Sequence, residues 1–330
     1  MWITSSLTTA KTPTRVALGN FDGIHRGHQK VIEPVLGHTI SDGVDRGSDS
    51  SDSYRFLLEE QSASVEQPKP LPTVVTFHPH PRQFFTGTSR PLLTPLEEKT
   101  QALRSLGVKQ LVLLPFNEAL SSLTPDAFVR IILVESLQAQ QVSVGQNFCF
   151  GSKRAGTAID LQSIAAQFGI PVEIVPLYCN DDERISSSAI REALTAGDPQ
   201  KANRLLGRPY KLMGQVVQGQ QLGRTIGFPT ANLQVPDDKF IPCRGVYSVW
   251  VSGVTVQPIR GVMNIGHRPT VSGQQQTIEV HILSWSGDLY GKTLTVALDR
   301  FLRPEQKFAS LEDLKAQIQQ DCLAAQVAVA

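Results

Sequence analysis

The stretch that decides the fold is residues 19–30, "GNFDGIHRGHQK", which places two histidines among three glycines. A short apolar run precedes it, and apolar residues on one helical face follow it at 31–36. A strand that turns through glycines into a helix leaves unpaired amides at the helix N-terminus, where phosphate binds well. His25 and His28 add donors there, so we predict a phosphate site. A lone H-x-x-H would instead favour two surface histidines beside a turn capped by Asp22.

The rest of the first half alternates short apolar runs with helical periods, which is typical of a parallel sheet with helices on both faces. The expected strands are residues 15–19, 73–77, 110–115, 142–145 and 172–176, and the expected helices follow Gly27 and lie near 95–106, 125–138 and 158–168. Residues 38–72 interrupt this order and are rich in Ser, Asp, Gly and Pro. We interpret them as a long mobile insertion.

The second half has a different pattern. After about residue 207, apolar residues alternate in twos between glycines and prolines, which predicts an antiparallel sheet or small barrel. A last helix is expected at 310–326, with Ser310 as its N-cap. We therefore expect a Rossmann-like α/β domain at 1–200, followed by an antiparallel β-barrel domain at 207–330 that carries a C-terminal helix.

Composition narrows the class of protein. The 330 residues are 41% hydrophobic and 18% charged, with a formal net charge of +1 and 7% aromatic residues. We expect no nucleic-acid partner, because no basic field is present, and no membrane segment, because no run approaches the required apolar length. The four cysteines are far apart, so we expect no disulfide framework, no zinc and no haem, and a cytoplasmic protein.

Four segments of the first half share a pattern with one family. They are "GNFDGIHRGH" (19–28), "TFHPHP" (76–81), "VGQNFCFGSKRAG" (144–156) and "RISSSAIREAL" (184–194). In this order they resemble the nucleotidyltransferase half of bifunctional bacterial riboflavin kinase/FAD synthetases. The resemblance implies transfer of AMP from ATP to FMN, by alignment and charge neutralisation rather than by a covalent nucleophile.

The same resemblance implies roles for single residues. His25, His28 and Arg184 would be the catalytic groups on the ATP phosphates, and arginine is a strong polydentate anion binder. ATP would also contact Gly19, Phe21, Gly27, Asn147, Ser187 and Ser188, and the flavin would contact Phe77 and Phe150. Ser187 and Ser188 are equally compatible with a plain helix N-cap.

The second half contains a glycine-rich segment, "GQVVQGQQLGRTIGFPTANL" (214–233), which is not a Walker loop. Its glycines would let backbone amides approach phosphate, although ordinary hairpin turns would give the same density. Thr230 and Asn232 offer oxygen ligands that suit Mg²⁺. In "TIEVHIL" (277–283), alternation places Glu279 and His281 on one face, and spacing alone gives Glu279 a minority chance of being a base.

The second half is similar to the riboflavin kinase half of the same family over nearly its whole length. By that resemblance Thr230 and Asn232 hold Mg²⁺ with ATP, and Glu279 is the base on the ribityl 5′-hydroxyl. The resemblance also implies that Gly219, Gly223 and Arg224 bind ATP, and that Arg303 and Glu305 belong to the flavin-side rim.

We therefore expect an enzyme that makes FMN from riboflavin and ATP, and FAD and pyrophosphate from FMN and ATP. One alternative keeps the kinase and makes the first half a regulatory nucleotide-binding module; intact His25, His28, Arg184 and Ser187 count against it. Another is a non-catalytic flavin or nucleotide carrier, which would not need Glu279 beside a metal pair. The sequence leaves the oligomeric state open.

Overall fold

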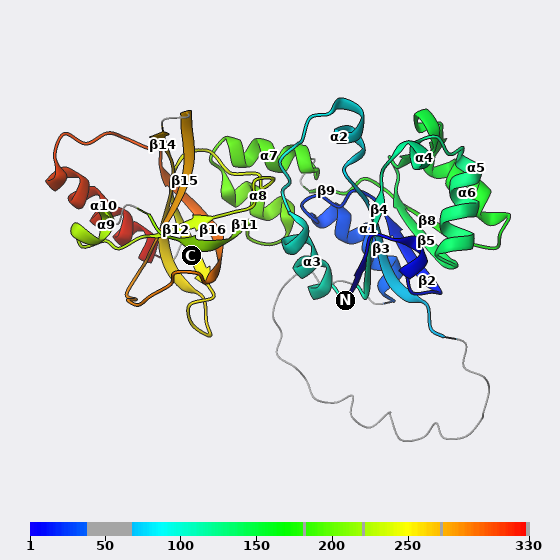
Figure 1. Cartoon of the computed structure of the whole chain (residues 1–330), viewed down its shortest axis with the longest axis horizontal. Helices are drawn as coiled ribbons and strands as arrows, with labels where there is room; N and C mark the ends of the chain where they lie inside the picture. Colours follow the sequence, from blue (N-terminus) through cyan, green and yellow to red (C-terminus); the bar gives the residue numbers. More distant parts are fainter. Residues whose placement is uncertain (38–67, 181–182, 220–221, 271–272, 328–330) are drawn as a thin grey trace, which may run out of the picture. The chain divides into compact units, whose positions relative to one another are not determined.

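A computed structural model describes residues 1–37, 68–180, 183–219, 222–270 and 273–327. The chain forms two compact units (Figure 1). Unit 1 comprises Met1–Thr88 and Thr100–Cys179, and unit 2 comprises Ser89–Lys99 and Asn180–Ala330. Most of the predicted insertion at 38–72 lies outside the described residues, although its last two residues already belong to a strand.

Unit 1 is built on a six-stranded sheet, in which every pair of neighbouring strands is parallel. The strand order is β1-β4-β3-β2-β5-β8. After β2, the chain adds β3 and β4 on one side of β2, and then adds β5 and β8 on its other side. The strands are β1 (Trp2–Thr4), β2 (Thr14–Leu18), β3 (Leu71–His78), β4 (Gln110–Pro115), β5 (Ala139–Gly145) and β8 (Val172–Val175). Ligands of such sheets bind at the carboxyl ends of the strands where the order reverses, here beside β2 and β5.

Helices cover both faces of this sheet, as expected. Residues Ala17, Val74 and Leu111 of the sheet pack in one core cluster with α1 and α3, whereas Val16, Leu18 and Val75 pack in a second with α5, η3 and α6. The helices are α1 (Arg26–Leu36), α2 (Pro81–Thr86), α3 (Leu96–Ser105), α4 (Glu118–Ser121), α5 (Pro125–Phe128), η3 (Val129–Ser136) and α6 (Ala158–Ala166). Short elements are η1 (Leu7–Thr9), η4 (Ser152–Arg154) and the pair β6 (Cys149–Phe150) and β7 (Gly156–Thr157).

Two details of unit 1 differ from the expectation. The predicted helix at 125–138 is α-helical only as far as Phe128 and continues as a π-helix, in which Leu137 N–H donates to the carbonyl of Ile132 at 3.0 Å. The edge strand β1 was not predicted, because three residues are too few to show alternation. Thr124 caps the start of α5, and Pro125 occupies its first turn as predicted.

Unit 2 contains the predicted antiparallel barrel, closed in the order β11-β12-β15-β14-β13-β16. Its strands are β11 (Lys211–Val217), β12 (Ala231–Gln234), β13 (Gly245–Ser252), β14 (Ile259–Thr270), β15 (Gly273–Ile282) and β16 (Thr293–Arg303). The other elements of unit 2 are α7 (Ser187–Thr195), α8 (Pro199–Leu206), α9 (Leu222–Thr225), α10 (Leu311–Gln326) and β10 (Glu183–Arg184). β10 pairs with the short strand β9 (Cys179–Asn180), which contains the boundary between the two units. Ser310 caps α10, as predicted.

A buried ion pair ties residues 89–99 into unit 2. The Lys239 ammonium donates to the carboxylate of Glu98 and, at 2.7 Å, to the carbonyl of Leu93. Burial raises the pKa of the Glu98 carboxyl above its ordinary value, and the nearby charge of Lys239 partly offsets this. Burial also lowers the pKa of Arg208. This segment therefore belongs to the folded core around the barrel.

Candidate active sites

The turn after β2 has a strained backbone. Phe21 and Ile24 have positive φ angles, 47° and 44°, which non-glycine residues seldom adopt and which are costly for β-branched side chains. Both side chains are 1% exposed, so core packing holds them in this conformation. Gly19 lies against the Phe21 ring, where an added Cβ would approach to 3.2 Å. Strain of this kind, fixed by surrounding packing, is common at ligand sites.

The two histidines of this turn have different surroundings. His25 is the N-cap of α1: its Nδ1 accepts from the backbone N–H of His28 at 3.2 Å, which leaves Nε2 as the protonated nitrogen of the neutral ring. The His28 ring stacks on it at 3.6 Å between centroids. His25 is only 6% exposed, whereas His28 is half-buried. A Cβ on Gly27 would lie 3.3 Å from the His25 ring, so glycine at this position leaves room for the capping side chain.

Other predicted residues lie at the same edge of the sheet. Asn147 is exposed in the turn that follows β5, the strand paired with β2, and Gly145 would meet its Oδ1 at 3.4 Å if it carried a Cβ. Phe77 is near the end of β3, on the other side of β2. Because the carboxyl ends of parallel strands share one edge, the structure brings Asn147 and Phe77 to the edge that carries the histidine turn.

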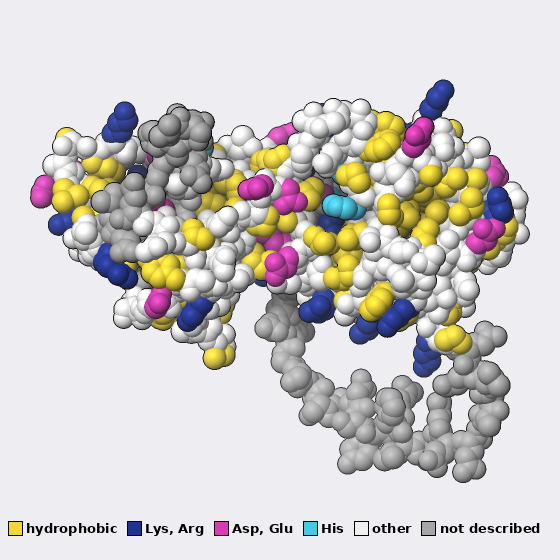
Figure 2. All heavy atoms as spheres, in the orientation of Figure 1, with side chains coloured by type: hydrophobic (Ala, Val, Ile, Leu, Met, Phe, Trp, Pro, Cys, Tyr) yellow, Lys and Arg dark blue, Asp and Glu magenta, His cyan; other side chains and the backbone are white. Residues whose placement is uncertain are grey.

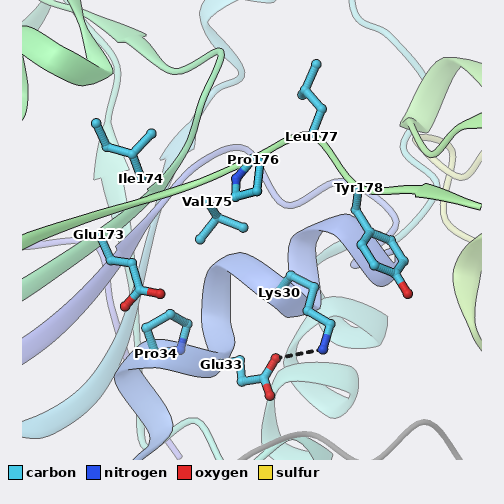
Figure 3. Close-up of a pocket in the computed structure, with 9 residues that line it drawn as sticks. All are labelled: Lys30, Glu33, Pro34, Glu173, Ile174, Val175, Pro176, Leu177 and Tyr178. Carbon is cyan, nitrogen blue, oxygen red and sulfur yellow. Dashed lines mark hydrogen bonds and ion pairs between the residues drawn. The ribbon is translucent and has the colours of Figure 1, made fainter.

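A pocket lies along α1 at this edge (Figure 3). Lys30, Glu33 and Pro34 line it from the helix, with the Lys30 ammonium 3.0 Å from the Glu33 carboxylate. The opposite wall is residues 173–178, the end of β8 and the segment that follows it. Tyr178 borders the pocket, and its Cβ would be 3.7 Å from a Cβ on Gly27, so this lining residue is also a neighbour of the first turn of α1. No motif singled out from the sequence predicted this pocket.

The two aromatic residues predicted for the flavin side, Phe77 and Phe150, have different surroundings, and their roles toward the flavin stay predictions. Phe150 is 5% exposed and packs against Phe128 and Phe148 in the core, so it has almost no surface to offer a ligand. Exposed aromatic surface comes instead from α2, where Phe84 is 39% and Phe85 69% exposed. Their rings and that of Phe77 each pack edge-on to Phe116, at 5.4–5.8 Å. Figure 2 shows hydrophobic side chains at the surface near α2 and α4. The adjacent phenylalanines at 84–85 were the missed signal.

The predicted triphosphate-binding residues Arg184, Ser187 and Ser188 belong to unit 2. Arg184 is exposed on β10. The N-cap of α7 is Ser186, whose hydroxyl accepts from Ala189 N–H at 3.2 Å, so the plain-cap interpretation of Ser187 and Ser188 is wrong. The roles of these three residues toward ATP stay predictions.

The barrel brings the predicted kinase residues together. Asn232 on β12 pairs directly with Glu279 on β15, and directly paired residues have their side chains on the same face. Thr230, just before β12, has its Oγ1 3.4 Å from Glu279 Oε2. Ile278, Val280 and Ile282 are buried on the opposite face, as the alternation predicted. A hydroxyl, an amide and a carboxylate therefore meet at one place on the barrel.

Glycines allow this close arrangement. A Cβ on Gly219 would lie 2.2 Å from Nδ2 of Asn232, and one on Gly223 would lie 2.3 Å from the carbonyl oxygen of Phe228. The space that a side chain at Gly219 would need is thus occupied by Asn232, the candidate metal ligand, and the space at Gly223 by the backbone of the loop before Thr230. Glycine at these two positions permits close approach, which an ordinary hairpin turn would not require. Arg224 is exposed on α9.

The predicted flavin-side residues of the barrel differ in their surroundings. Arg303 is held by Asp321 of α10, with guanidinium–carboxylate distances of 2.7–3.2 Å, so the structure gives it a structural partner. Glu305 is exposed, and its carboxylate would meet a Cβ on Gly266 at 2.4 Å. Asn264, which the sequence did not single out, pairs with Glu279 from β14 and is therefore a further polar neighbour of that carboxylate. Arg300 of β16 donates to the carbonyl of Ala324 in α10 at 2.7 Å.

Comparison with known proteins identifies both halves. A FAD synthetase family model matches residues 7–46 and 42–189, and a riboflavin kinase model matches residues 206–329. The bifunctional riboflavin kinase/FMN adenylyltransferase of Escherichia coli K12 is 37% identical over 94% of this chain and 91% of its own. This chain belongs to that family. Enzymes of the same name from Pseudomonas fluorescens and Bacillus subtilis are 39% and 34% identical, over 95% and 93% of this chain and 92% and 89% of their own.

A solved structure has the same fold as this chain over nearly its whole length. It is a Streptococcus pneumoniae protein described as a macrolide-efflux protein, with a TM-score of 0.81, 28% identity and coverage of 99% of both chains. In the part of this chain that the structure describes, no helix combines the length and apolarity needed to cross a membrane.

Proposed function

We propose that the two reactions of this bifunctional enzyme are divided between two sites. Riboflavin phosphorylation takes place at Thr230, Asn232 and Glu279, within a kinase module at 207–330, and FMN adenylylation within a module at 1–200. The observation that carries the first assignment is the 3.4 Å approach of the Thr230 hydroxyl to the Glu279 carboxylate. The barrel has no need of this polar group for its core, which lies on the other face of β15.

In the kinase reaction, Glu279 accepts the proton of the riboflavin 5′-hydroxyl. The hydroxyl oxygen forms a bond to the γ-phosphorus of ATP as the bond to the ADP oxygen breaks. Because no covalent intermediate on the protein is needed, the rate depends on how well the carboxylate is aligned with the attacking oxygen. Asn232 and the loop that carries Thr230 provide that alignment.

Both reactions use ATP with a divalent metal, and we propose Mg²⁺. The oxygens of Thr230, Asn232 and Glu279 are the hard donors that this ion prefers, and Gly219 leaves room for the Asn232 amide. Thr230 and Asn232 would hold the ion, which when bound neutralises charge on the phosphate oxygens. Glu279 would stay available as the base.

In the adenylyltransferase reaction, an FMN phosphate oxygen forms a bond to the α-phosphorus of ATP and the bond to pyrophosphate breaks. The N-terminus of α1 supplies amides and a partial positive charge for the phosphates. His28 is the more exposed histidine and would contact them, while His25 fixes the first turn of the helix. Arg184, Ser187 and Ser188 would bind the triphosphate, as the family resemblance implies.

The surroundings of the turn suggest where the two substrates bind. The pocket of Figure 3 has an apolar wall at Val175 and Pro176 and an aromatic edge at Tyr178, a residue that also lies beside Gly27 in the first turn of α1. These features suit the adenine of ATP. The exposed rings of Phe84 and Phe85 suit the flat isoalloxazine of FMN.

Two matched variants test the division. Purified protein is incubated with riboflavin or FMN, ATP and Mg²⁺, and the products are separated by chromatography. Glu279→Gln should lower FMN formation by about 100- to 10,000-fold and leave FMN-to-FAD conversion intact, because only the proton acceptor is lost. His28→Ala should do the reverse. Loss of both reactions in either folded variant would contradict the division, and FMN formation without FAD in the wild type would favour a regulatory first half.

A further inference from the structure

His281 lies two residues after Glu279 on β15, so the two side chains lie on the same face of the barrel. Its ring contacts the segment that leads to Thr230. Nδ1 of His281 is 2.8 Å from the carbonyl oxygen of Pro229, and the ring meets the Phe228 ring edge-on at 5.6 Å. One side chain thus contacts the two residues that immediately precede Thr230.

The hydrogen bond to Pro229 determines one feature of the imidazole. A carbonyl oxygen has no proton to give, so Nδ1 of His281 must carry the hydrogen and donate it. Nδ1 therefore cannot accept a proton from a substrate while this contact exists. This geometry favours a role for His281 in positioning the Pro229 segment rather than a role as a second base.

The segment before Thr230 also has backbone contacts that do not involve His281. Phe228 N–H donates to the carbonyl of Gly223 at 2.8 Å, and an added Cβ on Gly223 would be 3.3 Å from Oγ1 of Thr230. The segment before Thr230 is therefore held by backbone on one side and by His281 on the other. Without the His281 contact, the segment before Thr230 would lose its restraint on the β15 side.

We propose that His281 is a positioning residue for riboflavin phosphorylation. Its Nδ1–H holds the Pro229 carbonyl, and this keeps the Thr230 hydroxyl at the Glu279 carboxylate. The inference rests on the proposed kinase site but adds a residue to it. His281 itself touches neither substrate nor metal in this scheme.

A matched pair of substitutions tests the donor. Leucine at 281 keeps bulk and removes the hydrogen bond, whereas asparagine places an amide N–H near the position of Nδ1. Since a displacement of about 1 Å can cost about 100-fold, His281→Leu should lower kcat of riboflavin phosphorylation by about that factor, with KM for riboflavin little changed. His281→Asn should recover most of the loss. FMN-to-FAD conversion, measured on the same samples, should equal that of the wild type in both.

A second measurement does not depend on activity or on a variant that folds. In ¹⁵N-labelled wild-type protein at about pH 8, where an ordinary histidine is neutral, the long-range ¹H–¹⁵N spectrum distinguishes the two ring tautomers. We expect His281 to carry its hydrogen on Nδ1. A ring protonated only on Nε2 would overturn the proposal.

The kinetic outcomes are equally decisive. A His281→Leu enzyme with wild-type kcat overturns the inference, as does a His281→Asn enzyme that is as slow as His281→Leu. Equal loss of both activities would show a general structural role and would also overturn it. If Glu279→Gln phosphorylated riboflavin normally, the proposed kinase site itself would fail, so the two failures are distinguishable.

Discussion

Replacing Gly219 with alanine tests the kinase site through a single methyl group. The new Cβ would lie 2.2 Å from Nδ2 and 2.5 Å from Cγ of Asn232, whereas ordinary contacts begin near 3.4 Å. Asn232 must therefore retreat by a little more than 1 Å, or its strand must shift. The φ angle of Gly219 lies outside the left-handed region, so alanine adds no backbone strain and the effect is purely steric.

A displacement of this size at a reacting site costs about 100-fold in rate, so Gly219→Ala should lower kcat/KM for riboflavin phosphorylation by about that factor. FMN-to-FAD conversion on the same sample measures the amount of folded enzyme. The decisive control is the double variant Gly219→Ala/Asn232→Ala. If the methyl acts by displacing Asn232, it should add little once that side chain is absent. Full kinase activity in Gly219→Ala, or an equal loss in the Asn232→Ala background, would refute the reasoning.

Buried ion pairs give two further predictions, measured as free energies of unfolding in urea. Asp321→Asn leaves the guanidinium of Arg303 without its carboxylate and should cost about 3–5 kcal/mol, whereas Glu135→Gln, at an exposed pair, should cost about 1 kcal/mol or less. Lys239→Met should cost about 3–5 kcal/mol near neutral pH, because it leaves the Glu98 carboxylate buried and unpaired. Burial raises the pKa of the Glu98 carboxyl above its value in the unfolded chain, so the ionised carboxylate opposes folding where Lys239 does not offset it. The deficit of Lys239→Met should therefore shrink as pH falls below that raised pKa and grow as pH rises through it. An equal deficit at acidic and alkaline pH would contradict this account.

The regular parts of the fold could be predicted because their patterns are local. Val16-Ala17-Leu18 contribute to two different core clusters on opposite faces of the sheet, so an unbroken apolar run correctly indicated a strand buried on both sides. The π-helix at Val129–Ser136 could not be predicted, since its apolar residues fit an α-helical period as well. What changes is the backbone bonding, which tertiary packing decides.

For the candidate sites too, local sequence patterns predicted only part of the arrangement. The alternation in "TIEVHIL" was enough to place Glu279 opposite the core, but its pairing with Asn232 and Asn264 depends on the register of three strands in a closed barrel. Likewise, the sequence showed that Phe150 is aromatic but not that Phe128 and Phe148 enclose it. Residue type and local period are visible in a sequence, whereas cross-strand partners and exposure are set by contacts between distant segments.

The two sites depend on the rest of the molecule in different ways. The turn before α1 is held in an unfavourable backbone conformation by the buried side chains of Phe21 and Ile24, so its geometry is stabilised by the core of unit 1. The kinase site instead depends on close approach at Gly219 and on side-chain contacts to its loop. Conservative cavity-forming changes beneath the first site should therefore impair FAD formation before they unfold the protein, because the released turn relaxes toward ordinary φ angles. At the barrel, the damaging changes are added volume at Gly219 and loss of the side-chain contact from His281 to the loop.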